Sequence, residues 1–182
     1  TTRLDIGGAE AHVLGLAKQL KEMGHHPIVI SSGGVYVGEL EKMDIPHHYA
    51  PLDDKKCTDL LKSFKTFSKI IRNERIDVIH THGRIASLIS KIASISYKIP
   101  FMTTAHALFS YGGGLKYLTF WGEKVIAISE DVKQHLVDKF GVRKENITII
   151  ENGIDTYEFS AHPKNVDLIE KLGLSEDSIK VL

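Results

Sequence analysis

Hydrophobic and polar residues follow two patterns along the chain, one typical of helices and one typical of strands. Apolar residues that recur every three or four positions predict helices at residues 9–23, 39–43, 58–73, 85–97 and 130–140. Short apolar runs predict strands at residues 27–30, 47–52, 77–80, 101–104, 124–128 and 146–150. This alternation is typical of an α/β fold. We expect a doubly wound parallel sheet with helices on both faces, joined by right-handed crossovers.

Polar and small residues follow most of the predicted strands. In a doubly wound sheet, ligands bind outside the carboxyl ends of the strands, where the strand order reverses. The residues at these ends are Ser31 and Ser32, His80 to Gly83, His106, Ser129 and Glu130, and Glu151 to Gly153. We therefore expect the floor of a binding cleft along this edge of the sheet.

Gly7 and Gly8 open the first predicted helix, which Gly24 ends. Two glycines allow a tight turn and leave backbone N–H groups uncovered by side chains. Together with the positive end of the helix dipole, such a turn is an anion site, and phosphate is its usual ligand. A plain tight turn between a strand and a helix explains the two glycines equally well. The turn by itself does not distinguish a phosphate site from a plain turn, so the rest of the sequence is needed.

A dinucleotide-dependent oxidoreductase uses the same kind of sheet, so it is the first enzyme class to compare. Its fingerprint needs a third glycine in the turn and an acidic residue at the end of the second strand, where it holds the ribose. The turn at Gly7 lacks that glycine spacing, and the second strand ends in Ser31 and Ser32. Both features argue against this class.

Composition and charge narrow the partners and the compartment. The 182 residues include 23 Lys and Arg and 23 Asp and Glu, so the balanced charge gives no indication of nucleic acid binding. The single cysteine, Cys57, excludes an intramolecular disulfide and a multi-cysteine zinc site, and it suits a reducing cytosol. No apolar run approaches the roughly 18 residues of a membrane-spanning helix. We expect a cytoplasmic location.

Four segments of the chain are specific in their order and spacing. They are residues 7–10 with the helix up to Gly24, residues 77–83 (Asp-Val-Ile-His-Thr-His-Gly), residues 103–106 (Thr-Thr-Ala-His), and residues 125–130 continuing through 149–155 to Phe159. Together they resemble the N-terminal half of a family 4 glycosyltransferase, a retaining enzyme of the GT-B architecture with two Rossmann-like domains. The resemblance covers nearly the whole chain.

The resemblance implies a division into two parts. Residues 1–160 would form the N-terminal Rossmann-like domain, and residues 161–182 a linker and the beginning of the C-terminal donor-binding domain. The family has a strand before the glycine turn, so we expect that strand to be missing here and to leave a gap in the core. Residues 179–182 resemble only the first strand of the donor-binding domain, which supplies a pair of glutamates to the nucleotide. We therefore expect a fragment that is inactive by itself.

The resemblance also implies roles for individual residues. His106 is the candidate catalytic residue, facing the transferred sugar, because an imidazole can donate or accept a hydrogen bond near neutral pH. Gly7 and Gly8 would present backbone N–H groups to the donor diphosphate and stabilise charge on the leaving phosphate. Glu10, His82 and Asn152 are candidate contacts to the acceptor or the sugar. Glu10 either caps its helix or touches substrate, and the sequence leaves both open.

His80 and His82 lie two residues apart, so their side chains share one face of a strand. Two such histidines can bind a metal, but no carboxylate or third ligand lies near them in the sequence. We expect an acceptor contact or a bystander role instead. The resemblance likewise implies neither a metal nor another cofactor, because the nucleotide-sugar is a substrate.

Three functions remain at this stage. The first is transfer of a sugar from a nucleotide-sugar donor to a sugar or a lipid-linked acceptor, with retention of the anomeric configuration. The second is a non-catalytic module of the same fold that binds a glycan or a protein partner. A nucleotide-sugar epimerase with two Rossmann-like domains is a related third. An intact glutamate pair in a C-terminal half would favour transfer, and its loss would favour binding.

A basic stripe lies on the predicted helix at residues 58–73. Lys62, Lys65, Lys69 and Arg72 recur at intervals of three and four, beside the apolar face. A cationic helix face holds a protein against an anionic bilayer, at about 1 kcal/mol per charge near the surface. The alternative is an ordinary solvated face. Peripheral contact with the inner face of the membrane through this helix is therefore a hypothesis to test.

Overall fold

The computed structural model describes residues 1–53, 56–110, 112, 119–156, 159–161 and 166–173. The chain divides into two compact units, Thr1–Asn152 and Gly153–Leu182. The second unit contains the helix α6 (Val166–Lys171). The boundary predicted at residue 160 falls inside this second unit, and the assignment of residues 161–182 to a linker and a donor-binding domain stays a prediction. Residues 179–182, which resemble a strand of that domain, lie outside the described residues.

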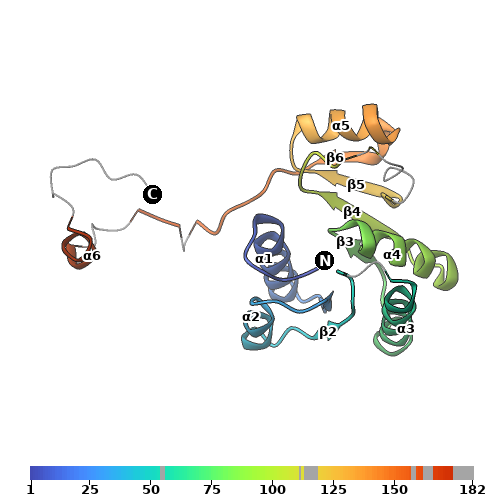
Figure 1. The fold of residues 1–182 in the computed structure, drawn as a ribbon, viewed down its shortest axis with the longest axis horizontal. Helices are drawn as coiled ribbons and strands as arrows, with labels where there is room; N and C mark the ends of the chain where they lie inside the picture. The colour runs from blue at the N-terminus through green and yellow to red at the C-terminus, as the bar shows by residue number, and fades with distance from the viewer. Residues whose placement is uncertain (54–55, 111, 113–118, 157–158, 162–165, 174–182) are drawn as a thin grey trace. The chain divides into compact units, whose positions relative to one another are not determined.

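Helices and strands alternate through the first unit, which confirms the predicted α/β fold (Figure 1). In chain order the elements are α1 (Gly8–Glu22), β1 (Val29–Ser31), α2 (Val37–Lys42), β2 (His47–Tyr49), α3 (Cys57–Glu74), β3 (Ile79–Thr81), α4 (Arg84–Tyr97), β4 (Phe101–Ala105), β5 (Lys124–Ala127), α5 (Glu130–Phe140), the 3-10 helix η2 (Lys144–Asn146) and β6 (Ile147–Ile149). Each predicted helix and strand is present, and no end is shifted by more than three residues.

The strands form two parallel sheets within the described residues. One holds β1 and β2, and the other holds β3, β4, β5 and β6 in this order (Figure 1). Because β3 and β4 pair in parallel with Thr81 opposite Thr103, their carboxyl ends lie at the same edge of the sheet. This register brings the segments that follow the two strands close together.

Residues 1–4 lie between the two sheets. The Leu4 N–H donates to the Gly33 oxygen at 2.8 Å, and the Ser32 N–H donates to the Thr2 oxygen at 2.8 Å. On the other side, the Thr2 hydroxyl lies so close to Gly83 that a Cβ there would be less than 3.0 Å from it. Leu4 is fully buried. The prediction that the family's first strand is missing here, with a gap in the core, stays a prediction.

Helix ends follow the sequence signals closely. After α1, Gly24 adopts a φ of +86°, its N–H donates to Lys21 O, and the His25 N–H donates to Leu20 O. These two bonds are the Schellman motif that a C′ glycine favours. Ser129 caps α5, since its hydroxyl accepts from the Val132 N–H at 3.3 Å. The end of α1 also brings a correction: Met23, predicted to lie on the buried face, is 71% exposed at the C-cap.

Three buried hydrophobic clusters hold the first unit together. The first packs α3 and α4 against the segment after β2, and its buried members are Ala50, Leu52, Phe67, Ile71, Ala86, Ile89 and Ala93. The second packs α1 and α2 around residues Leu4, Val13, Ala17, Val29, Leu40 and Ile45. The third packs α5 on the sheet through Ala105, Val125, Ala127, Val132, Leu136 and Ile147. Among the described helices, none is both long and apolar enough to cross a bilayer.

Candidate functional site

His80 and His82 are neighbours at the carboxyl end of β3, as their spacing predicts. Their ring centroids are 4.3 Å apart. His80 lies in the strand, and its Nε2 is hydrogen-bonded to the hydroxyl of Thr104 at 2.7 Å. Thr104 is fully buried in β4. This bond fixes the His80 ring, which in turn packs against His82.

His106 follows β4 and meets His82 at the same edge of the sheet. The His82 Nδ1 and the His106 Nε2 are hydrogen-bonded at 3.0 Å, and the two rings stack with centroids 5.3 Å apart. The other nitrogen of His106, Nδ1, is buried and has no hydrogen-bond partner within the described part of the chain. The parallel register of β3 and β4 therefore joins two predicted site residues that are 24 positions apart.

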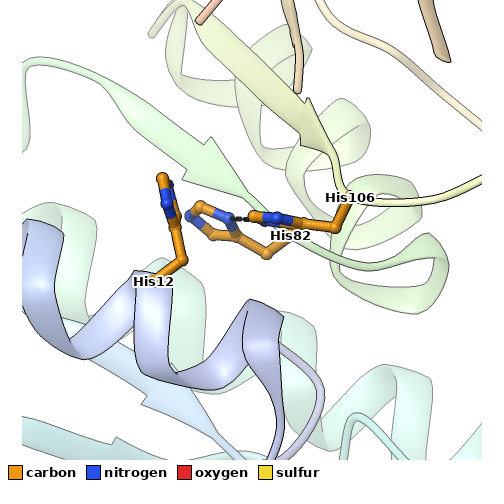
Figure 2. Close-up of side chains that lie close together, drawn as sticks. All are labelled: His12, His82 and His106. Atoms are coloured by element: carbon orange, nitrogen blue, oxygen red, sulfur yellow. Dashed lines mark hydrogen bonds between the residues drawn. The ribbon is translucent and has the colours of Figure 1, made fainter. Parts of the chain in front are cut away.

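His12 is a member of this site that the sequence analysis missed. It lies on α1, and its ring centroid is 4.9 Å from that of His106 and 5.8 Å from that of His82 (Figure 2). The position four residues after Gly8 is the one signal that the sequence carries, since residues four apart share a helix face. That signal places His12 near the glycine turn but gives no indication of the two histidines that follow the strands.

Burial keeps these imidazoles neutral at pH 7. It lowers the pKa of His106 to about 4 and the pKa of His80 to about 4, with the neighbouring His12 adding to the shift in both. Burial also lowers the pKa of His12, and it holds the pKa of His82 well below 6.5, with His80 adding to that shift. A neutral imidazole has one N–H donor and one nitrogen acceptor. The cluster can therefore hydrogen-bond to sugar hydroxyls or ligate a metal without first losing a proton.

The glycine turn lies at the start of the same helix that carries His12. Gly7 is the N-cap of α1 with an extended backbone, and no side chain caps the helix from this position. The N–H groups of a first helical turn have no partner within the helix, so they are available to an anion. The Glu10 carboxylate folds back over Gly7, where a Cβ would be less than 3.0 Å from it. Glu10 thus lies beside the candidate anion site.

Asn152 is not part of the histidine group. It is exposed in the segment after β6, at the end of the first unit. In the sheet, β5 separates β6 from β4, whose end carries His106. The predicted contact of Asn152 with the acceptor or the sugar therefore stays a prediction.

One group of side chains in the described residues brings together three nitrogens that could hold a metal ion. His12, His82 and His106 each offer a nitrogen, and these three nitrogens all lie within 4.8 Å of one another. In the sequence, His80 and His82 form a pair without a third ligand near them. The fold supplies other histidines from distant segments, which sequence spacing could not reveal.

The sequence of the chain matches a known protein family. The sequence model of Glycosyltransferase Family 4 matches residues 6–158. The chain is 26% identical over 176 residues to the phosphatidylinositol N-acetylglucosaminyltransferase gpi3 subunit of Schizosaccharomyces pombe, covering 86% of this chain and 38% of that protein.

Solved structures also resemble the fold, among them the following two. A glycosyltransferase from Rickettsia africae superposes with a TM-score of 0.79 at 28% identity, over 97% of this chain and 49% of that one. The Anabaena Alr3699/HepE protein in complex with UDP-glucose superposes with a TM-score of 0.74 at 20% identity, over 95% of this chain and 48% of that one. The chain thus spans half or less of the length of these proteins.

Proposed function

Because the chain belongs to glycosyltransferase family 4, we propose that it is the acceptor-side half of a nucleotide-sugar-dependent transferase that retains the anomeric configuration. In this proposal a second, donor-binding half holds most of the nucleotide. The lengths of the matched proteins support this division, since the chain covers 38% of the fission yeast relative and 49% of the Rickettsia structure.

One observation carries the proposal: the N-terminus of α1 and the two strand-end histidines converge at one place. His12 lies four residues, about one helical turn, from Gly8, and its ring packs edge-on against His106. Free N–H groups at the helix start are suited to a diphosphate, and neutral imidazoles are suited to sugar hydroxyls. A nucleotide-sugar presents both groups next to each other.

The proposed chemistry assigns each group a task. When the bond between the sugar and the diphosphate breaks, negative charge develops on the leaving phosphate. Backbone N–H groups at Gly7 and Gly8 would stabilise that charge without reorganising, which is how preorganised dipoles lower a barrier. His106 would hold the transferred sugar through Nδ1, because its Nε2 is already hydrogen-bonded to His82, and this nitrogen makes one hydrogen bond to a hydroxyl. His82 would orient His106 through the 3.0 Å hydrogen bond.

The donor-binding assignment is tested by calorimetry. The chain by itself is titrated with UDP-glucose, the ligand of the Anabaena structure, and with a guanosine-diphosphate sugar. We expect weak or no binding of either, because this half supplies only the diphosphate and sugar contacts. Tight binding with one donor per chain would instead place the complete nucleotide site on this half and overturn the division.

A lipid-linked acceptor is the acceptor class that the surface supports. The fission yeast relative is named for a phosphatidylinositol substrate. On this chain, Lys62, Lys65, Lys69 and Arg72 are all exposed along α3. Lys65, Lys69 and Arg72 also line a shallow groove of about 390 Å³, together with Phe64 and Tyr97. Cations around a partly apolar groove suit an anionic lipid surface.

Co-sedimentation with liposomes tests the membrane contact. The chain is mixed with vesicles of neutral lipid and with vesicles that contain anionic lipid, at low salt, where the attraction is strongest. At about 1 kcal/mol per charge, the double variant Lys65→Gln/Lys69→Gln should bind anionic vesicles about 30-fold more weakly. The control Lys124→Gln/Lys144→Gln removes the same charge from exposed positions outside α3. Equal loss in both variants, or negligible binding to both vesicles, would rule out docking through α3.

A further inference from the structure

We propose that His12, His82 and His106 form a binding site for a divalent transition-metal ion such as Zn²⁺, with one coordination position left open. The three imidazoles come from α1, from the segment after β3 and from the segment after β4. Figure 2 shows the three side chains close together, with their hydrogen-bonded pair, His82 and His106, marked by a dashed line. Three histidines and a fourth open position are a common arrangement for zinc in proteins.

The distances between the nitrogens suit such an ion after a small adjustment. With Zn–N bonds of about 2.0–2.1 Å in a tetrahedral arrangement, the nitrogens lie about 3.4 Å apart. Here the three nitrogens, one from each imidazole, are within 4.8 Å of one another. His12 is half-buried on a helix surface, so a change in its side-chain torsions can bring its ring closer.

An independent observation also points to a missing ligand. The Nδ1 of His106 is buried and has no hydrogen-bond partner among the described residues. Buried polar atoms nearly always have a partner, so an unpaired one needs an explanation. In addition, His80 packs against the His82 ring and is itself anchored by Thr104 at 2.7 Å. Such an outer layer orients the ligands of known metal sites.

The donor set selects the class of ion. All three ligands are imidazoles, and no carboxylate among the described residues belongs to the group. Imidazole suits Zn²⁺, Cu²⁺, Ni²⁺ and Co²⁺, whereas Mg²⁺ and Ca²⁺ require oxygen ligands. Occupancy would engage His106. One consequence rests on the proposed function: the ion and the transferred sugar compete for His106, so Zn²⁺ inhibits transfer and EDTA restores it.

Cobalt(II) is the probe for the site because its visible spectrum reports the coordination geometry. The exposed Cys57 is replaced in all proteins, as Cys57→Ser, because a free thiol also binds such ions. His12→Gln is the main variant, since glutamine is tolerated on a helix surface. His82→Gln is the second variant, and the double variant His25→Gln/His26→Gln is the control, because both of these histidines are exposed.

We expect one Co²⁺ per chain with the intense visible bands of tetrahedral coordination, displaced by one equivalent of Zn²⁺. Loss of second-shell partners alone weakens metal sites by about 10- to 100-fold, so loss of a ligand in His12→Gln should weaken binding by at least about 100-fold. The control should bind as the parent does. No binding by the parent, or binding that persists in His12→Gln, or binding that the control loses, would each overturn the site. These outcomes do not depend on transfer activity, so they leave the proposed function to its own test.

Discussion

Gly34 holds the segment before the glycine turn in place, and its replacement by alanine should be strongly destabilising. Gly34 has a φ of +138°, and a Cβ there would lie less than 3.0 Å from backbone atoms of Leu4 and Asp5. The backbone conformation costs an L-residue about 1–3 kcal/mol. Relief of the clash requires Leu4 to move out of its cluster, where it is fully buried, and burial of a leucine contributes about 1.5–3 kcal/mol. We expect Gly34→Ala to lower the free energy of unfolding by about 3–5 kcal/mol.

Urea denaturation followed by circular dichroism measures this loss, with Gly24→Ala as the matched control. Gly24 also has a positive φ, +86°, but nothing lies within 4 Å of its added Cβ. The control therefore reports the conformational strain without the clash, about 1–2 kcal/mol. The difference between the two variants isolates the contact with residues 4 and 5. If both variants lose the same free energy, Leu4 and Asp5 are not packed on Gly34 and the reasoning fails.

Three further predictions concern the site and the core. As the pH is lowered from 7.5 to 4.5, with EDTA present, the free energy of unfolding should fall. His80 has a pKa of about 4 in the folded protein but about 6.5 in the unfolded chain, so protons bind to the unfolded chain first and stabilise it. At about 1.4 kcal/mol per pKa unit, protonation of His80 accounts for up to about 3 kcal/mol of this loss. Urea titrations should therefore show a smaller dependence of the unfolding free energy on pH in His80→Gln. An unchanged pH dependence would contradict the burial of a neutral His80 ring. Thr104→Val removes the hydroxyl that holds His80 and should cost about 1–3 kcal/mol by urea denaturation, whereas a neutral result would mean that water replaces it. Leu136→Ala should cost about 2–5 kcal/mol, and clearly more than Val137→Ala, which is only half-buried; a reversed order in thermal melts would contradict the packing of α5.

Much of the fold follows from local sequence signals. Periodicity located α3 and α5, and short apolar runs located the strands; the residues at the two ends of α5, Ser129 and Gly141, are of types that begin and end helices. These signals act over a few residues, so one sequence contains them in full. Errors occurred where tertiary packing decides: Leu61 belongs to the apolar pattern that predicts the helix at residues 58–73, but it is 63% exposed. The periodic stripe was wider than the surface that α4 and the segment after β2 cover.

The candidate site was only partly predictable. His82 and His106 were found because each follows a strand, and parallel strands end at one edge of a sheet. His12 was not predicted as a site residue, because its place in the site depends on how α1 lies over that edge of the sheet. No local sequence pattern encodes that arrangement. The division of the strands into two sheets was not predicted either, because it depends on long-range pairing of the strands.

Turnover of the His106→Ala variant is the most direct test of the proposed glycosyl transfer. The chain is joined to its donor-binding half, and release of nucleoside diphosphate from the nucleotide-sugar is followed in the presence of acceptor. The account predicts a loss in kcat of about 100-fold or more, typical of removing a positioned hydrogen-bonding group at a reacting centre, with an unchanged melting temperature. His25→Ala, an exposed histidine after α1, should retain full turnover. Normal turnover of His106→Ala together with a lowered melting temperature would show that His106 supports the fold and does not act in the transfer.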